Sequence, residues 1–424
     1  MNEEFLHFVW KHQLFQKHKL IGDNGERIEI ISTGTHNFDS GPDFFNVRLK
    51  INNITWAGNV EIHVNSNDWY KHKHHENESF DNVILHVVQN HNGEVRNSKG
   101  KRIPTAELKF ENSIVEKSEE LKKSEDWIQC EKHIHKINSF IFESWISRLT
   151  VERLERKTKE ILEELEKNNS NWEETFYHQL GRNFGLKTNS LPFGLLVKNT
   201  PLRIAGKHKN DLFQLEALFF GNSGLLEKNI VSDTYYQNLK KEYRFLQKKY
   251  KLNPLKASLW KFMRLRPVNF PTIRIAQFAA FIYKSTHMFS KLLHLDSYEE
   301  VTSLFNVQAS EYWNTHYTFG NETPKTIKKI GKSSINLIFI NTLIPFLFAY
   351  GVFHKLDHFK EKGINFLHLI PKENNSLIRK WNDLGIDSKN AFMTQGLIEL
   401  KNNYCSKMKC LYCQLGIKFI TNNF

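Results

Sequence analysis

Three residues near the N-terminus have the types and spacing of a metal-dependent hydrolytic site. Asp43 follows Pro42 at the start of an apolar run, and Glu61 and His63 lie two positions apart on the next apolar run. Alternate side chains of a β-strand share a face, so Glu61 and His63 point the same way if their run is a strand. If the two runs pair as neighbours, Asp43 approaches that face. Two carboxylates and an imidazole then predict a site for Mg²⁺ or Mn²⁺.

Each of these residues has a chemical role in the expected site. Asp43 and Glu61 would hold the ion, with positions left open for a phosphate and an attacking water. His63 would be a further ligand or a general base. Glu3 or Glu4, on an expected N-terminal helix, would add another carboxylate.

A structural alternative stays open for the same residues. Asp43, next to a proline and a glycine, is also typical of a residue that orders a turn. Glu61 and His63 would then form the solvent face of an antiparallel strand, with Val60 and Ile62 facing the core.

Histidine is concentrated in the N-terminal region, where ten of the 20 histidines fall in the first 91 residues. The run His72-Lys73-His74-His75 is expected to be a solvated loop. His86, inside a short apolar run, is expected to be a hydrogen-bonded core histidine. A second metal hypothesis uses His63, His74 or His86 with carboxylates as zinc ligands.

The elements expected around these residues alternate in type. Apolar spacing predicts a helix over Glu3–Phe15, and a short helix is expected over Asp68–Lys73. Strands are expected over the following ranges: Arg27–Ser32, Phe44–Ile51, Ile54–Val64, Val83–Val88 and Thr105–Phe110. Asn52-Asn53 predicts a hairpin turn.

This αβββαβ order, together with Asp43 and Glu61-x-His63, resembles the PD-(D/E)xK nuclease superfamily, with His63 where the usual lysine stands. The resemblance implies a restriction-endonuclease-like domain over residues 1–115 and a nuclease activity.

The four cysteines suggest a second metal site. Three lie in the spacing Cys405-x4-Cys410-x2-Cys413, and the fourth is Cys130. In a reducing compartment this spacing favours a metal over disulfides, and four thiolates fit Zn²⁺ or a [4Fe–4S] cluster. His133 or His135 are alternative zinc ligands, and ordinary reduced thiols are the plain alternative. The pattern resembles the iron–sulfur staple of RecB-like nucleases, except that there the lone cysteine precedes the nuclease motifs.

Residues 116–136, which include Cys130, are expected to form a charged linker, because Glu116–Glu125 is dense in charge. Residues 137–424 are expected to be helical, with the cysteine trio at their end. Helices are expected over the following ranges: Phe140–Leu165, Asp211–Phe220, Tyr235–Tyr250, Thr272–Leu293, Ser297–Phe305, Ile335–Phe353 and Asn390–Tyr404. The fold class is therefore α+β, with a larger all-α domain after the nuclease-like one.

The net charge of +13 is unevenly distributed along the chain. Residues 1–115 carry 13 Lys/Arg and 15 Asp/Glu, whereas residues 116–424 carry 46 and 31. Excess Lys/Arg favours a polyanionic partner, so nucleic acid is expected to bind the second part. Arg264, Arg266 and Arg274, around two prolines, are the expected phosphate contacts. The alternatives are a solvated surface rich in lysine and arginines bonded to loop carbonyls.

No secretory signal is expected at the N-terminus, since Met1-Asn2-Glu3-Glu4 is acidic and no apolar stretch follows. A cytoplasmic protein is therefore predicted. The apolar run Ile335–Phe353 approaches the length of a membrane span, but it contains Asn336, Asn341 and Pro345. A buried helix kinked at Pro345 is expected, and no membrane partner is predicted.

The whole chain resembles an uncharacterised bacterial family of unknown function. The motifs that carry this resemblance are the following: Gly34-x-x-Asn37-x-Asp39-Ser40-Gly41-Pro42-Asp43-Phe44, Gly58-Asn59-Val60-Glu61-Ile62-His63, Ser66-x-Asp68-Trp69, Asp81–Val88, Arg266-Pro267-x-Asn269-Phe270-Pro271 and the cysteine trio. The family implies no activity. From the chemistry of the residues we expect a metal-dependent nuclease or phosphodiesterase. The alternatives are a non-catalytic scaffold or nucleic-acid-binding adaptor, and another metal-dependent hydrolase.

Overall fold

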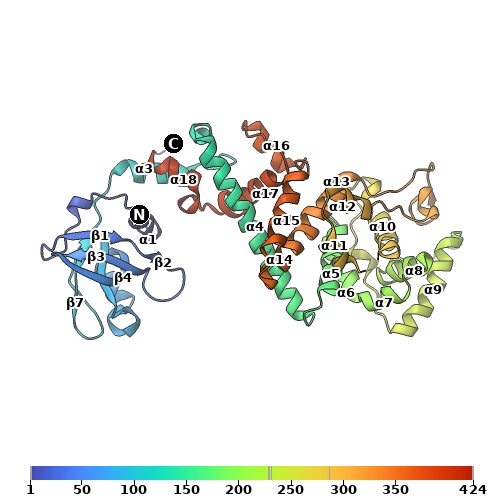
Figure 1. Cartoon of the computed structure of the whole chain (residues 1–424), viewed down its shortest axis with the longest axis horizontal. Helices are drawn as coiled ribbons and strands as arrows, with labels where there is room; N and C mark the ends of the chain where they lie inside the picture. The colour runs from blue at the N-terminus through green and yellow to red at the C-terminus, as the bar shows by residue number, and fades with distance from the viewer. Residues whose placement is uncertain (1, 228–229, 231, 286, 423–424) are drawn as a thin grey trace. The chain divides into compact units, whose positions relative to one another are not determined.

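The computed structural model describes residues 2–227, 230, 232–285 and 287–422. The chain divides into two compact units. The first unit consists of Met1–Trp145 and Leu400–Phe424, and the second consists of Ile146–Glu399. The chain is a mixed α and β protein, with its main sheet in the N-terminal part and helices through most of the remainder (Figure 1).

A mixed sheet forms the centre of the first unit, with strand order β1-β3-β4-β5-β8. Its strands are β1 (Ile28–Ser32), β2 (Thr35–His36), β3 (Phe44–Ile51), β4 (Ile54–Asn65), β5 (Val83–Asn90) and β8 (Thr105–Glu107). β1, β3 and β4 are antiparallel neighbours, whereas β4, β5 and β8 run parallel. β2 pairs with β3, and β6 (Val95–Arg96) and β7 (Arg102–Ile103) form a separate ribbon.

The β3–β4 hairpin has the bounds that the sequence predicts. Asn52 and Asn53 both have positive φ, which is the backbone that a tight two-residue hairpin turn requires. Within β4, four consecutive residues from Val60 to His63 are buried, so both faces of this strand are covered. The register between β3 and β4 shifts between Phe44 and Val47, and such bulges often re-aim side chains beside functional sites.

Short helices cover this sheet. Helix α1 (Glu3–Lys11) packs on β4 and buries five of its side chains, which are Phe5, Leu6, Phe8, Val9 and Trp10. α2 (Asp68–Lys71) follows β4, α3 (Asn112–Lys123) follows β8, and α18 (Gln414–Thr421) packs on α3. Short 3₁₀ turns complete the unit at Lys17–Lys19, His74–Glu76, Glu78–Phe80, Glu131–Lys136, Cys405–Lys407 and Cys410–Tyr412.

The second unit is helical around one large aromatic core. Its helices are α4 (Ser139–Lys167, shared with the first unit), α5 (Trp172–Phe184), α6 (Ser190–Asn199), α7 (Leu202–Lys207), α8 (Leu212–Asn222), α9 (Thr234–Tyr250), α10 (Pro271–Lys284), α11 (Met288–His294), α12 (Tyr298–Leu304), α13 (Lys332–Ile338), α14 (Ile344–His354), α15 (Asp357–Leu369), α16 (Ser376–Asp383) and α17 (Ala391–Glu399). A small hairpin, β9 (His316–Thr318) and β10 (Asn321–Glu322), lies among them.

Helix Lys332–His354 is long and apolar enough to span a membrane, but 72% of its most apolar window is buried within the protein. It consists of α13, a π-helical turn at Phe339–Leu343 and α14. The turn ends just before Pro345, where the sequence predicts a kink, because proline lacks the N–H that continues the helical bonding.

The structure differs from the expected organisation in three places. Most of the expected linker segment Glu116–Glu125 belongs to helix α3, which buries Ser118 and Leu121. The C-terminal residues Leu400–Phe424 belong to the first unit and not to the helical part. The expected helix Thr272–Leu293 is divided into α10 and α11, and residue 286 lies outside the described residues.

Candidate metal centre

Asp43 and Glu61 lie side by side on adjacent strands. Asp43 immediately precedes β3, and Glu61 is on β4 beside it. The backbone N–H of Asp43 donates to Oε2 of Glu61 at 3.1 Å, and Oδ2 of Asp43 accepts from the backbone N–H of Ile62 at 2.8 Å. This reciprocal pair fixes both carboxylates, so the expected approach of Asp43 to the Glu61 face is confirmed.

Two histidines lie close to the other oxygen of Glu61, and a third lies beside one of them. Oε1 of Glu61 lies 3.2 Å from Nε2 of His74 and 3.6 Å from Nε2 of His63. Nε2 of His63 lies 3.1 Å from Nδ1 of His72. His63, His72 and His74 each offer a ring nitrogen within 4.8 Å of the other two. Three imidazoles therefore gather near the end of β4, and two of them, His63 and His74, lie beside the Glu61 carboxylate.

The segment after β4 places His72 and His74 over the sheet. Oδ2 of Asp68, the first residue of α2, accepts from the backbone N–H of Asn65. In the turn after α2, Lys73 has a left-handed backbone conformation. The fully buried Trp69 supports His74 from one side, and Phe80 stacks on the His74 ring at 3.9 Å between centroids. The expected solvated loop is confirmed for His72 and Lys73, which are exposed, whereas His74 is half-buried and lies beside Glu61.

Burial keeps Glu61 and His63 neutral in the absence of a cation. Burial, reinforced by the Asp43 carboxylate, raises the pKa of Glu61 to about 9. Burial and the neighbouring histidines lower the pKa of His63 to about 2. Neutral imidazoles are the form that ligates a metal, and a divalent cation would supply the positive charge that favours an ionised Glu61.

Three of the distances between these groups are close to those between the ligands of a tetrahedral ion. Zinc ligands at their usual distances stand about 3.3 Å from one another, and the three distances around Glu61 and His63 lie between 3.1 and 3.6 Å. Among the residues that the structure describes, the buried Nε2 of His74 has no hydrogen-bond partner, despite its 3.2 Å approach to Glu61. Two polar atoms that are close to each other, but not aligned for a hydrogen bond, are typical of two ligands that point at one metal ion.

His86 stands behind this group, as a core histidine. It is fully buried on β5, and its Nε2 lies 2.8 Å from Nδ1 of His63. Burial, with His74 and His91, lowers its pKa to about 3, so the ring is neutral. The expected hydrogen-bonded core position of His86 is confirmed, and the ring orients His63.

A second polar group adjoins the cluster at α1. Nε2 of His7 lies 3.2 Å from Oδ2 of Asp43, and both side chains keep part of their surface exposed, at 16% and 21%. Burial would lower the pKa of His7, but Asp43 outweighs it and the pKa is raised. Burial raises the pKa of Glu3, which is close enough to His72 and Asp43 to interact with their charges. Of the two glutamates expected on the first helix, Glu3 is the one that this group includes.

The four cysteines also come together, within the first unit. Cys130, Cys405 and Cys413 are buried, Cys410 is partly buried, and none forms a disulfide. Burial, followed by Cys413 and Cys410, raises the pKa of Cys130 to about 12. Burial, followed by Cys413, raises the pKa of Cys410 to about 12. The thiols therefore lie within electrostatic range of one another.

Packing between the two cysteine segments explains this convergence. Nε2 of Gln129 donates to the Met408 sulfur at 2.9 Å, and the ring of His133 stacks on Phe419 at 4.4 Å between centroids. The backbone N–H groups of Gly416 and Leu415 bond the Cys413 thiol and counteract the burial that raises its pKa.

The three arginines that were expected to contact phosphate lie in different environments. Arg264 and Arg266 are exposed. Arg274 is 4% exposed, and its guanidinium donates to Asn269 at 2.6 Å and to Ser334 at 2.7 Å. The structure therefore places Arg274 in the interior, where its bonds tie α10 to its surroundings, and not on the expected binding surface.

Sequence reasoning missed His72 as a member of the site and assigned His74 to it only in one alternative. The signal available in the sequence was the pattern His72-Lys73-His74, which follows the strand that carries Glu61 and His63. The left-handed turn at Lys73 and the buried Trp69 beneath it position these histidines. Neither feature can be predicted from the spacing of residues in the sequence.

A comparison with family models matches residues 3–376 to a family described as proteins of unknown function, DUF2851. The chain belongs to this family. The matched range includes the candidate metal centre and ends before the cysteine trio. No curated protein and no solved structure matches the chain.

Proposed function

We propose that this DUF2851 protein is a metal-dependent hydrolase that cleaves phosphodiester bonds in nucleic acid. The observation that carries the proposal is the cluster of His63, His72 and His74 near the end of β4. The Glu61 carboxylate lies beside two of these histidines and is bonded to Asp43. Metal-dependent hydrolysis needs a held cation with open positions and a nearby base.

The composition of the cluster favours a transition metal. Three imidazoles and one carboxylate suit Zn²⁺ or Mn²⁺ better than Mg²⁺, which prefers oxygen ligands and retains several waters. Of the two metals expected from the sequence at this site, Mg²⁺ and Mn²⁺, the cluster favours Mn²⁺. Zn²⁺ is a further candidate at the same position. The bound ion would polarise a phosphoryl oxygen and promote ionisation of water.

Asp43 and His7 are suited to the proton transfer. Both are partly exposed, unlike Glu61 and His63, so water and substrate reach them. Asp43 raises the pKa of His7. The raised pKa makes the His7–Asp43 pair a better acceptor for a proton from the attacking water. In this proposal Asp43 is both the neighbour that fixes Glu61 and the carboxylate beside the attacking water.

The choice of phosphodiesters rests on two further features. The order and directions of α1, β1, β3, β4, α2 and β5 resemble the PD-(D/E)xK plan, and in this proposal Asp43 and Glu61 would take the positions of its two motif carboxylates. The Lys/Arg excess after residue 115 and the exposed Arg264 and Arg266 favour a polyanionic substrate.

Cleavage of labelled single-stranded, duplex and flap DNA and RNA in Mn²⁺ or Zn²⁺ tests this proposal. Asp43→Ala and Glu61→Gln should abolish cleavage while the circular dichroism spectrum is retained. Glu29→Gln, on β1, is the matched control and should leave cleavage unchanged. Metal binding at Glu61 without cleavage of any of these substrates contradicts the nuclease proposal and favours an adaptor.

We also propose that Cys130, Cys405, Cys410 and Cys413 hold a structural metal centre, either Zn²⁺ or a [4Fe–4S] cluster. Buried thiols that raise one another's pKa are stabilised as thiolates when a cation binds among them. The amides of Leu415 and Gly416 support the same thiolate form. Such a centre would fasten the C-terminal segment to the segment around Cys130.

A further inference from the structure

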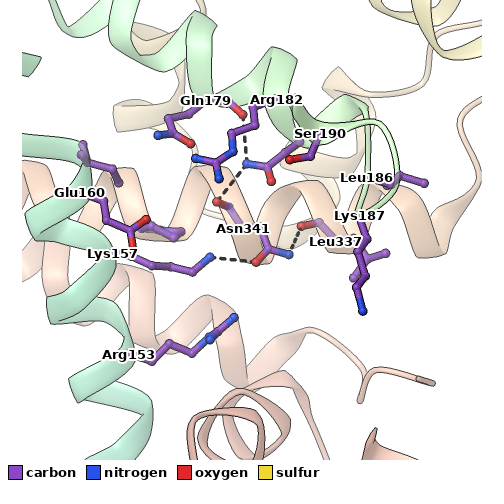
Figure 2. A pocket seen from close by; sticks show the side chains of 13 residues that line it. Arg153, Lys157, Glu160, Gln179, Arg182, Leu186, Lys187, Ser190, Leu337 and Asn341 are labelled. Carbon is purple, nitrogen blue, oxygen red and sulfur yellow. Dashed lines mark hydrogen bonds between the residues drawn. The ribbon is translucent and has the colours of Figure 1, made fainter. Parts of the chain in front are cut away.

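The second unit contains a basic pocket, separate from the candidate metal centre. Its volume is about 470 Å³, and α4, α5 and helix Lys332–His354 contribute to its lining (Figure 2). The cationic side chains that line it are Arg153, Lys157, Arg182 and Lys187. Glu160 is its acidic residue, and part of its wall is apolar, formed by Ile161, Leu186, Leu337 and Pro345.

The charges of this pocket are only partly compensated from within. Arg153 pairs with Glu399 at 3.3 Å and donates to Gln395 at 2.6 Å. The carboxylate of Glu160 pairs with Arg156 at 3.2 Å. Over the described ranges of the chain, no carboxylate lies within ion-pair distance of the other three cations, which are Lys157, Arg182 and Lys187. The pocket therefore carries uncompensated positive charge.

The π-helical turn shapes one wall of the pocket. Pro345 lacks the N–H that would bond the carbonyl of Asn341 in a regular helix, and Nδ2 of Asn183 donates to that carbonyl at 3.2 Å. The Asn341 side chain projects into the pocket, where its Oδ1 accepts from Nζ of Lys157 at 2.8 Å (Figure 2). Single π turns within α-helices often occur at functional sites.

We infer that this pocket binds a small phosphorylated ligand of nucleotide size. Arginine and lysine in a concave site provide charge-assisted bonds to phosphate oxygens, while the apolar wall accommodates an organic group. The volume lies in the range of small-molecule sites, and it is too large for a bare phosphate alone. This inference is independent of the proposed hydrolase.

The state of Lys157 agrees with an anionic ligand. Burial, followed by Arg153, lowers the pKa of Lys157 to about 7. A bound phosphate beside Nζ would favour the protonated amine and would offset the repulsion from Arg153. The pocket thus gains a full lysine charge when the ligand is present.

Isothermal titration calorimetry of the full chain with pyrophosphate and with ATP, in EDTA, tests the inference. The Glu61→Gln background is titrated in parallel, so that phosphate bound at the candidate metal centre is recognised. We expect saturable binding of both probes, with ATP tighter than pyrophosphate because of the apolar wall. Arg182→Ala and Lys187→Ala should each weaken binding by about tenfold or more, the usual scale for a lost charge-assisted contact.

The matched control is Arg203→Ala, an exposed arginine of α7 outside the pocket, which should change affinity by less than about twofold. Arg182→Lys should recover part of the affinity, because it restores the charge without the planar fork. Absence of binding at millimolar probe overturns the inference. So does binding that Arg182→Ala and Lys187→Ala leave intact, or binding of oligonucleotides without the small probes.

Discussion

Nδ1 of His63 lies 2.8 Å from Nε2 of His86, and both rings are almost completely buried. A neutral imidazole that presents a lone pair at Nε2 carries its proton at Nδ1. If Nε2 of His63 ligates a metal, its Nδ1–H must therefore donate to His86. The hydrogen bond fixes both the tautomer and the ring orientation of His63, so His86 is a positioning residue for the candidate metal centre.

The first prediction concerns His86. His86→Leu fills the same space but leaves the buried Nδ1–H of His63 without an acceptor, so the affinity for Zn²⁺ or Mn²⁺ should fall about 10- to 100-fold. His86→Gln, which offers an amide oxygen, should lose less. Competition titration against a coloured chelator measures this, with His18→Ala, an exposed histidine outside the site, as the control. Wild-type affinity in His86→Leu would contradict the assignment of His63 as a ligand.

The second prediction separates metal binding from folding at Glu61. Because burial and Asp43 raise the pKa of Glu61 to about 9, its carboxyl is neutral at pH 7 without metal. Glu61→Gln, which is also neutral and of the same shape, should change the metal-free melting temperature by less than about 3 °C. The stabilisation that Zn²⁺ or Mn²⁺ gives to the wild type should disappear in the variant.

Thermal denaturation with EDTA and with added metal measures both effects. Glu29→Gln, at an exposed carboxylate on β1, is a matched control that should keep the metal-dependent stabilisation. If Glu61→Gln is strongly destabilised in EDTA, the carboxylate is ionised in the metal-free protein, contrary to the neutral cluster. If metal stabilises Glu61→Gln as much as the wild type, Glu61 is not a ligand.

The strands around the site were predictable because local signals determine them. The bounds of β3 follow from its alternating apolar and polar residues, and Asn52-Asn53 supplies the positive φ values of a tight two-residue hairpin turn. The pairing of β3 with β4 brings Asp43 near Glu61, and the bulge between Phe44 and Val47, which the sequence does not reveal, sets their exact register. Side-chain periodicity was therefore sufficient to predict that these two site residues lie close together.

Other features were not predictable because distant residues decide them. Glu116–Glu125 has the charge density of a linker, yet α3 is stabilised by burying Leu121 and packing on α18, some 300 residues later. Arg274 has the sequence context of a phosphate contact, but Ser334 accepts its hydrogen bond in the interior. Local composition carries no information on such long-range partners.

The third prediction concerns the cysteines. Protein purified without chelator should contain about one zinc or one [4Fe–4S] cluster per chain that Cys130→Ser and Cys410→Ser both lose. Metal analysis measures zinc, and absorption near 400 nm reports a cluster. Limited proteolysis should then cleave the C-terminal segment faster in either variant, whereas Ser406→Ala, at an exposed position between the cysteines, should behave as wild type. Full metal content in Cys130→Ser would contradict a four-cysteine centre.

The fourth prediction concerns the pH dependence of stability in the second unit. Oε1 of Glu164 lies 3.3 Å from Nδ1 of His178 and 3.1 Å from Nζ of Lys198. Burial opposes ionisation, but His178 and Lys198 outweigh it and lower the pKa of Glu164 to about 2. The pKa of His178 is raised, against its burial, by Glu164 and Glu174.

The pKa shifts of Glu164 and His178 define the pH range in which the two groups contribute most to stability. A lowered carboxyl pKa stabilises the fold above the unfolded value of 4.5, and this is lost as the pH falls toward 2. A raised imidazole pKa stabilises the fold below 6.5, and this is lost as the pH rises through the folded value. Both contributions are therefore present between pH 4.5 and 6.5.

Urea unfolding of Glu164→Gln against the wild type measures this contribution. At pH 5.5 the variant should lose about 1 to 2 kcal/mol, a value reduced for partial solvent screening, and the difference should shrink toward pH 3 and above pH 8. Glu166→Gln, on the exposed side of α4, should show no such dependence. A difference between wild type and Glu164→Gln that stays constant from pH 3 to 8 would indicate that Glu164 acts through packing alone, since only a change in charge can make its contribution vary with pH.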